Sequence, residues 1–570
     1  MDRAKLIRVA RGQEPADLLL ANATIVNVLT GEIYPADVAI HDGMIVGVGD
    51  AYEALERVDL RGLTLIPGLI EGHIHIESTM LSVPEFTRVV LAHGTTSAIV
   101  DPHELANVLG LDGVRMVLRQ ARQVPLDIRV MLPSCVPASS FESAAAILDV
   151  HALAALAGDP GVLGLGEMMN FPGLLEGEAD LLAKVALFGP DGHVDGHAPG
   201  LQGRDLSAYI VAGPRTDHES TTAAEAEEKL RKGLWLMVRE GSTEHNLRDL
   251  LPVIQRLRPS RSLFVSDDIT PNHLLEHGHL DAILRQAVAL GLDPVQAVRM
   301  ATIQPAQCFG LARRGAIAPG FFADIVAVED LRGFTVRQVY KDGRLVARDG
   351  ETILPLPSLD VAGTTGRLRI PPLDRTSFRI PGTAGMARVI GVIPNQIVTE
   401  HLLLPAPYSD GELVADPARD IAKLAVIERH GGSGRIGLGL VRGFGLRSGA
   451  LASSVAHDAH NLVVLGMSDD EMLLAARHVI EQGGGVAVVI GNEVLADLPL
   501  PIAGLLSPLP LPEVAARLDA LDAAAVRLGS ALEHPLMTLS FLALSVIPAL
   551  KLTDQGLVDV TRFKIVALQD

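Results

Sequence analysis

An alternation of strand and helix patterns over residues 62–315 constrains the fold of this chain more than any other feature. Helical patterns cover residues 84–93, 111–123, 144–157 and 223–232, and a long helical region follows at 273–310. The candidate strands end near His75, Asp101, Pro133, Glu167, His197, His218, Gly241 and Asp267. Eight strand–helix steps in about 250 residues fit an α/β fold of the (β/α)8, TIM-like barrel type.

An open, doubly wound sheet is the alternative fold for such an alternation. Ligands of an open sheet cluster at one switch point, whereas acids and histidines here follow at least six candidate strands. In a (β/α)8 barrel, the functional residues lie at the C-terminal ends of the strands. The distribution therefore favours the barrel, with one site assembled from many strand ends.

Histidines and carboxylates at these strand ends predict a metal site. His73 and His75 are two residues apart, and side chains at that spacing on a strand point to the same face. Imidazole and carboxylate ligands suit Zn, Fe, Mn, Co or Ni. His73, His75 and Asp267 could bind a more buried ion, and His197 and His218 an outer one. Glu167 is placed to bridge the two ions.

Each of these residues also has an interpretation without a metal. Glu167 alone could be a solvated loop acid, and His197 could be a turn histidine. Asp217 could cap a helix N-terminus and so explain the residues around His218. The prediction of a metal site therefore depends on the order and position of all the residues together.

Two further regions flank the predicted barrel. Residues 1–61 and 316–360 both contain short strands with Asp-Gly hairpin signals, at Asp42-Gly43 and Asp342-Gly343. These segments could form one small β-sandwich around the barrel. Residues 375–570 are predicted to be a separate α/β domain. Its many glycines lack the Walker or dinucleotide-binding spacing, which argues against phosphate binding.

Composition excludes several classes of function. The chain has 570 residues and a formal net charge of −20, which argues against nucleic acid or anionic membrane as the main partner. Cys135 and Cys308 can form neither a disulfide framework nor a CxxC zinc site. The apolar stretch 539–550 is too short to span a membrane, and residues 1–10 lack a signal-peptide core. We therefore expect a cytoplasmic protein.

Several short motifs stand at the ends of the predicted barrel strands, and others lie in the C-terminal region. Those in the predicted barrel are residues 67–78, Asp101-Pro102-His103-Glu104, 166–170, 195–200, Asp217-His218-Glu219-Ser220 and Ser266-Asp267-Asp268. Those in the C-terminal region are Gly443-Phe444-Gly445-Leu446 and the segment 453–461. Together these motifs closely resemble those of the bacterial adenine deaminases, a family within the amidohydrolase superfamily, and the resemblance spans nearly the whole chain.

This resemblance implies a hydrolase that converts adenine and water to hypoxanthine and ammonia in purine salvage. A hydroxide between two metal ions would attack C6 of adenine. The ions would be Mn(II) or Fe(II), with zinc possible, and the chain would form a homo-oligomer, a dimer or a tetramer. The implied ligands, by position, are His73, His75, Glu167, His197, His218 and Asp267.

The chain departs from other members of the superfamily at two positions. Many relatives have a carbamylated lysine on the fourth strand, where this chain has Glu167. Mononuclear nucleobase deaminases have a glutamate shortly after the fifth-strand histidine. In this chain Ala198, Pro199 and Gly200 follow His197, so that glutamate is absent. Both departures favour two ions bridged by a carboxylate over a single zinc ion.

Four residues are candidates for moving protons. Asp267 is the candidate base for the attacking water, because it would contact both an ion and the water. Asp101, His103 or Glu104 could carry protons to the purine ring or hold its edge. The same segment also reads as a helix start, with Asp101 as the cap, proline at the first position and Glu104 in the first turn. The two interpretations are compatible.

The sequence also allows other interpretations of the C-terminal histidines and of the activity. His457, Asp458, His460 and Asn461 could bind a metal, form a hydrogen-bonded turn, or shape the barrel mouth or a subunit contact. A cyclic amide hydrolase of the dihydroorotase or hydantoinase type could use the same barrel, although residues 164–170 offer no lysine for it. A catalytically inactive binding protein is the other alternative, and the presence of all six candidate ligands argues against it.

Overall fold

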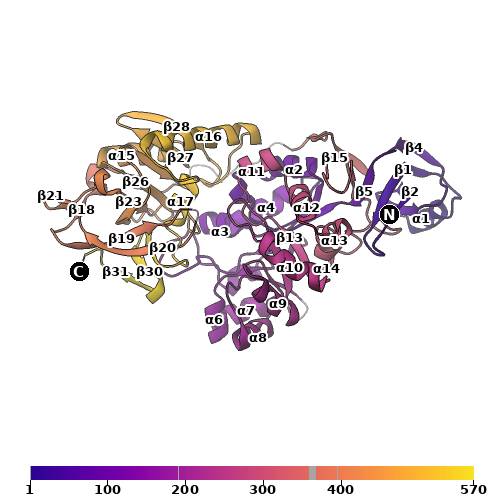
Figure 1. The fold of residues 1–570 in the computed structure, drawn as a ribbon, viewed down its shortest axis with the longest axis horizontal. Coiled ribbons are helices and arrows are strands. Elements are labelled where there is room, and N and C mark those ends of the chain that lie inside the picture. The colour runs from indigo at the N-terminus through magenta and orange to yellow at the C-terminus, as the bar shows by residue number, and fades with distance from the viewer. Residues whose placement is uncertain (1, 190–191, 358–367, 395, 570) are drawn as a thin grey trace.

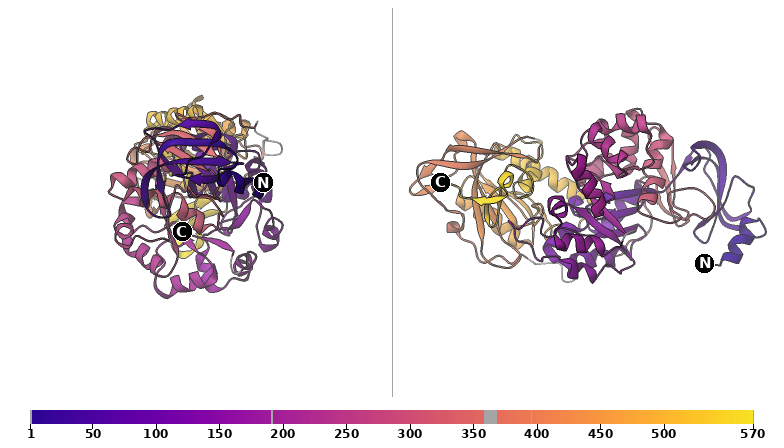
Figure 2. Two further views of the ribbon diagram at one scale, coloured as in Figure 1. Left: turned by 90° about the vertical axis from the view of Figure 1, so that its right-hand side faces the viewer. Right: turned by 90° about the horizontal axis from the view of Figure 1, so that it is seen from below.

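The chain folds into three parts that follow one another along the long axis of the molecule (Figure 1). The structure is a computed structural model that describes residues 2–189, 192–357, 368–394 and 396–569. A β-sheet lies at one end, a region of parallel strands and helices lies in the middle, and a second α/β part lies at the other end. Figure 2 shows the same order from below.

The sheet at the N-terminal end combines strands from both sides of the middle region. Its order is β17-β16-β15-β14-β5-β1-β2-β3, with β4 paired to β1. Strands β5 and β14 pair antiparallel, so the two segments join at the entry and exit of the middle region. The strands are β1 (Ala16–Asn27), β2 (Glu32–His41), β3 (Met44–Val48), β4 (Ala54–Asp59), β5 (Thr64–Pro67), β14 (Ile325–Val328), β15 (Val336–Lys341), β16 (Arg344–Arg348) and β17 (Glu351–Thr352).

Both predicted Asp-Gly hairpins occur in this sheet. Asp42 and Gly43 connect β2 to β3 with φ angles of 50° and 75°, and Asp342 and Gly343 connect β15 to β16 with 47° and 74°. Positive φ at both central residues is the backbone of a two-residue turn that matches the strand twist. The joined segments form one continuous hydrogen-bonded sheet of nine strands.

Eight parallel strands in sequence order form the middle region. Strands β6 to β10 make a five-stranded sheet, and β11 to β13 make a three-stranded sheet. A parallel bridge between Ile74 and Asp267 connects the last strand to the first. The strands are β6 (Leu69–Ile74), β7 (Thr95–Val100), β8 (Asp127–Leu132), β9 (Val162–Met168), β10 (His193–Gly196), β11 (Thr216–Asp217), β12 (Trp235–Arg239) and β13 (Ser262–Val265).

Helices alternate with these strands, as predicted, with one correction. The helix expected over residues 144–157 is limited to α5 (Val150–Ala154). Ser143, just before it, hydrogen-bonds through its backbone N–H to Asp554, which holds the preceding chain outside a helix. The other helices are α2 (Val83–Ala92), α3 (His103–Leu109), α4 (Leu111–Ala121), α6 (Phe171–Glu176), α7 (Ala179–Ala186), α8 (Gly203–Ala212), α9 (Ala223–Arg231), α10 (Leu247–Leu257), α11 (Pro271–His277), α12 (Leu280–Ala289), α13 (Pro294–Met300) and α14 (Ile303–Cys308).

Apolar side chains from both parallel sheets meet in one buried cluster. Ile99 and Met131 come from the five-stranded sheet, and Met237 and Leu263 come from the three-stranded sheet. Phe309, after α14, completes the cluster. The two sheets therefore share one apolar interior.

The C-terminal part is built on an eight-stranded sheet of order β20-β19-β24-β23-β26-β25-β27-β28. Helix α15 (Asp469–Glu481) packs on one face of it, and α16 (Leu511–Leu528) contacts β27 and β28. The strands are β19 (Met386–Val392), β20 (Thr399–Pro405), β23 (Ile421–Ile427), β24 (Ile436–Arg442), β25 (Ala450–Ser453), β26 (Leu462–Gly466), β27 (Gly485–Ile490) and β28 (Glu493–Pro499). A short sheet of β29 (Leu550–Thr553), β30 (Gly556–Asp559) and β31 (Lys564–Val566) adds to this part.

Polar contacts connect the C-terminal part to the middle region. The backbone N–H of Leu511 donates to Glu85 at 2.7 Å, and the hydroxyls of Ser139 and Ser545 are 2.6 Å apart. The amide of Asn461 donates to the carbonyl of Ser143 at 3.0 Å. Among the residues that the structure describes, no helix is long and apolar enough to cross a membrane.

Candidate active site

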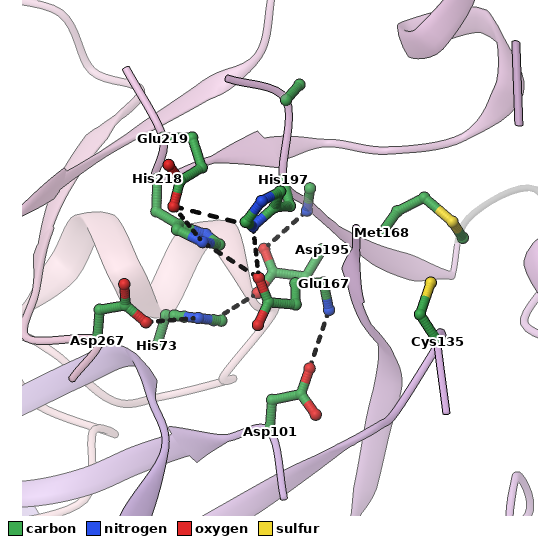
Figure 3. Close-up of polar contacts among 12 residues, drawn as sticks. His73, Asp101, Cys135, Glu167, Met168, Asp195, His197, His218, Glu219 and Asp267 are labelled. Atoms are coloured by element: carbon green, nitrogen blue, oxygen red, sulfur yellow. Dashed lines mark hydrogen bonds and ion pairs between the residues drawn. The ribbon is translucent and has the colours of Figure 1, made fainter. Parts of the chain in front are cut away.

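The six predicted ligands come together at the C-terminal ends of the parallel strands, and Figure 3 labels all of them except His75. His73 lies on β6 and His75 follows it directly, with their ring centroids 4.8 Å apart. The remaining four follow or end their own strands: Glu167 on β9, His197 after β10, His218 after β11 and Asp267 after β13. The spacing of these residues in the sequence therefore predicted their meeting point.

Glu167 lies at the centre of the cluster. Its Oε1 atom is 3.2 Å from Nε2 of His75, and its Oε2 atom is 2.7 Å from Nδ1 of His197 and 3.3 Å from Nε2 of His218. Burial opposes ionisation of this carboxyl, but the three histidines around it hold its pKa well below the ordinary value. Each carboxylate oxygen thus faces a different group of histidines, which is the arrangement a bridging ligand needs.

Asp267 faces the histidine pair of the first strand. Its Oδ1 atom lies 3.1 Å from Nε2 of His75 and 3.4 Å from Nε2 of His73. Its backbone N–H donates to the carbonyl of His73 at 3.0 Å, and its backbone has a φ of 57°. The left-handed backbone and this hydrogen bond together hold the carboxylate against the first strand.

The hydrogen bonds around the two first-strand histidines fit metal ligation. Nδ1 of His73 donates to Asp195 at 2.9 Å, and Nδ1 of His75 donates to the carbonyl of Asp101 at 2.9 Å. With a proton on Nδ1, each ring directs the lone pair of Nε2 into the cluster. Nε2 of His73 is buried and has no hydrogen-bond partner among the described residues. The donor set therefore fits divalent ions that prefer imidazole and carboxylate.

The structure places the Asp101-Glu104 segment next to the same cluster. Helix α3 begins at His103, with Pro102 as the cap residue, so the expected cap at Asp101 is wrong. The Asp101 carboxylate instead accepts the backbone N–H of Glu167 at 3.0 Å, and burial followed by the Glu167 charge raises the pKa of Asp101 to about 7. Nδ1 of His103 lies 3.5 Å from Oε1 of Glu167.

The alternative role considered for Asp217, helix capping, is also wrong. Helix α9 is capped by Thr222. The Asp217 carboxylate instead accepts from the ammonium of Lys229 at 2.8 Å and from the backbone N–H of Ala198 at 3.0 Å. These buried contacts tie together the chain segments that carry His197 and His218.

Three charged residues that contact the cluster were not predicted from the sequence to be functional. Asp195 orients His73. Arg239, at the end of β12, donates to Oδ2 of Asp267 at 2.9 Å and pairs with Glu219. Glu219 in turn lies 3.5 Å from Nε2 of His218. Asp195 and Glu219 stand beside predicted ligands in their motifs, but no spacing rule indicated which atoms they would contact.

A cavity of about 530 Å³ lies between this face and the C-terminal part. The middle region contributes residues that follow β6, β12 and β13, among them Ser78, Ser242 and Thr270. The C-terminal part contributes His457 and Ser540. The volume is within the range of small-molecule sites.

Comparison with known proteins agrees with this architecture. Residues 64–346 match the amidohydrolase family, and residues 396–564 match the adenine deaminase C-terminal domain. An adenine deaminase of Nitratidesulfovibrio vulgaris (strain DP4) is 49% identical over 562 residues, which cover 98% of this chain and 97% of that protein. Adenine deaminase 2 of Carboxydothermus hydrogenoformans is 46% identical and covers 98% of each chain. The chain therefore belongs to the adenine deaminase family of amidohydrolases.

Proposed function

We propose that this protein hydrolyses adenine to hypoxanthine and ammonia. The observation that carries the proposal is the buried cluster of four histidines, Glu167 and Asp267 at the strand ends, in a chain that aligns along its length with adenine deaminases. The reaction replaces the amino group on C6 of the purine with oxygen from water. The adjacent cavity has room for one purine and its water.

We infer that two divalent ions bind in this cluster, with Mn(II) or Fe(II) preferred and zinc possible. His73, His75 and Asp267 would hold one ion, and His197 and His218 the other, with Glu167 shared between them. This division is supported by the two faces of the Glu167 carboxylate, one toward His75 and one toward His197 and His218. When bound, such ions make water a nucleophile at neutral pH.

The remaining chemistry is proton movement, which we assign to nearby residues. As oxygen adds to C6, the attacking water loses a proton and the neighbouring ring nitrogen gains one. The amino group must then gain a proton before it leaves as ammonia. Asp267 is the proposed acceptor of the water proton. Asp101, His103 and Glu104 are the candidates for holding the ring edge and returning protons, because they line the same buried region.

We further infer that the two parallel sheets act as one (β/α)8 barrel, covering residues 62–315. The Ile74–Asp267 bridge supports closure at one junction. At the other junction, the Arg215 N–H donates to the Val194 carbonyl at 2.9 Å. Residues 1–61 with 316–360 and residues 375–570 are the proposed flanking domains, and a homo-oligomer, dimer or tetramer, is the proposed assembly.

The deciding experiment measures adenine turnover by the Mn(II)-loaded full chain. Hypoxanthine formation is followed by ultraviolet absorbance and ammonia by an independent assay, and metal content is measured on the same sample. We expect equal amounts of both products and about two ions per chain, with activity lost after chelation. Two bound ions without turnover would reject adenine as the substrate, and other purines and cyclic amides would then be screened.

A further inference from the structure

The C-terminal part reaches into the active-site region through the segment that carries His457 and His460. Nδ1 of His457 lies 2.8 Å from Oε1 of Glu104, and Nε2 of His460 lies 3.6 Å from Oε2 of the same carboxylate. All three side chains are buried. Each carboxylate oxygen of Glu104 therefore faces one histidine from the other part of the molecule.

These three residues could hold a metal ion, but the hydrogen bonds around His460 argue against it. Nδ1 of His460 accepts the backbone N–H of Ala456 at 3.1 Å. A neutral imidazole that accepts at Nδ1 carries its proton on Nε2. Nε2 of His460 is the atom that faces Glu104, so its N–H points toward the carboxylate, at a distance too long for a hydrogen bond, and it has no lone pair for an ion. The close ion pair with His457 and this longer approach of His460 together form a clamp around the carboxylate.

His457 is held in place independently of Glu104. Its ring stacks on Phe541 of α17 (Pro535–Phe541), with centroids 5.1 Å apart and an angle of 20° between the planes. Its backbone N–H donates to the hydroxyl of Ser540 at 3.3 Å. The imidazole is therefore fixed by the C-terminal part before it contacts the barrel, which lets it set the position of the Glu104 carboxylate.

Glu104 stands between the metal-binding cluster and the cavity. It follows His103, whose ring lies 4.5 Å from that of His75 and whose Nδ1 atom lies 3.5 Å from Glu167. On the other side, its partner His457 lines the cavity of about 530 Å³. Glu104 therefore lies between His103, which is next to the cluster, and His457, which is in the wall of the cavity.

The charges of the pair support a persistent contact at neutral pH. Burial opposes the charged form of His457, but the Glu104 carboxylate outweighs it and raises the pKa of His457 to about 10. Burial likewise opposes ionisation of Glu104, and the neighbouring histidines bring the pKa of Glu104 far below its ordinary value. A buried ion pair is costly to break from one side, because the remaining charge is left without a partner.

We propose that His457 and His460 are positioning residues of the active site, which hold the Glu104 carboxylate between the strand-end cluster and the cavity. This inference rests on the proposed function and deepens it. The active site is then complete only when the C-terminal part is docked on the barrel. Adenine turnover thus depends on two histidines that lie outside the barrel and contact no predicted metal ligand directly.

Substitutions at His457 test this clamp in the full, Mn(II)-loaded chain. His457→Phe keeps a ring against Phe541 and removes the donor, whereas His457→Asn keeps an N–H close to the position of Nδ1. His478→Ala is the matched control, because His478 makes a similar 2.8 Å contact with Asp497 on the far side of the C-terminal part. Each substitution is also combined with Glu104→Gln.

We expect His457→Phe to lower kcat by ~10–100-fold, since a misplacement of about 1 Å can cost ~10²-fold. KM should change less than kcat, and metal content should stay at the level of the unaltered chain. His457→Asn should recover most of the loss. In the Glu104→Gln background, His457→Phe should add little, because both changes act through one carboxylate.

Three results would overturn the proposal. The first is unchanged kcat in folded His457→Phe, or in His457→Ala if the phenylalanine variant does not fold. The second is a full multiplication of the two losses in the double variant, which would show that His457 acts apart from Glu104. The third is absence of adenine turnover in the unaltered chain with two ions bound, which would remove the proposed function and this role together.

Discussion

The carboxylate of Asp195 lies 2.9 Å from Nδ1 of His73 and leaves Nε2 of that ring free to face the cluster around Glu167. Both side chains are almost completely buried. Carboxylates that orient a ligating histidine in this way fix its tautomer and raise its basicity. Asp195 is not one of the six predicted ligands, but this contact predicts that it affects the affinity for the ion proposed to bind at His73.

Replacement of Asp195 should therefore weaken metal binding. For Asp195→Ala we expect a loss of ~10–100-fold in affinity for one ion, the effect typical of removing such a partner. Metal content after dialysis against a graded chelator measures it. Asp205→Ala, an exposed acid in the first turn of α8, is the control. Equal metal retention in both variants would contradict the orienting role.

Replacement of Glu104 should separate proton transfer from metal binding. Glu104→Gln preserves the shape of the side chain but cannot exchange a proton, so we expect kcat to fall by ~10²–10⁴-fold, the range of general acid–base contributions. Two ions should remain bound. Turnover and metal content on one preparation measure both effects. Loss of an ion would instead assign Glu104 to the ligand set.

Removal of the metal ions should destabilise the folded chain. Ligands that bind only the folded state stabilise it by mass action, by about 4 kcal/mol when the free ion is at ~1,000 times its Kd. We expect the Tm to fall after chelation and to recover on addition of Mn(II), while Mg(II), which prefers all-oxygen sites, restores little. A Tm that is independent of Mn(II) would argue against a site preformed by Glu167, Asp267 and the four histidines.

Asp522 of α16 should make stability depend on pH. Burial, and then the nearby Asp519, raise the pKa of Asp522 from 3.8 to about 6. The folded chain therefore holds this proton more tightly than the unfolded chain. The stability contributed by the protonated form is full below pH 4, falls between about pH 4 and pH 6, and is absent above that window.

Asp522→Asn removes this pH dependence and should stabilise the chain at pH 8. We expect a gain of about 1 kcal/mol, discounted because the side chain is partly exposed. Urea unfolding of both chains at pH 8 and pH 5 measures it, with a smaller difference at pH 5. A difference that is the same at both pH values would show that charge on Asp522 is not its cause.

The sequence contained enough information to predict the meeting of the six cluster residues. Regular alternation of strands and helices places every strand end on one face, so His73, Glu167 and Asp267 could be assigned to one site from their order alone. Their role as ligands stays a prediction, as does the proton transfer assigned to Glu104. The substrate was predicted from the resemblance to a known family and not from the spacing of these residues.

Contacts between segments that are distant in the sequence could not be predicted from the order of strands and helices. Glu104 and His457 meet because one part of the molecule docks on another, and no local pattern encodes that surface. In the sequence Arg239 is an ordinary strand residue, and only the structure shows its contact with Asp267. The helix expected over residues 144–157 is shortened for the same reason, because the backbone N–H of Ser143 donates to Asp554, which is far away in the sequence.

The pairing of β5 with β14 has a consequence for how the chain is made. Strands β1 to β5 are synthesised before β14, so β5 lacks this neighbour until the middle region has also been synthesised. Loop-closure entropy makes such distant pairing slow, and an unpaired strand edge invites association with other chains. The nascent strand β5 is therefore expected to expose an unpaired edge until β14 is available.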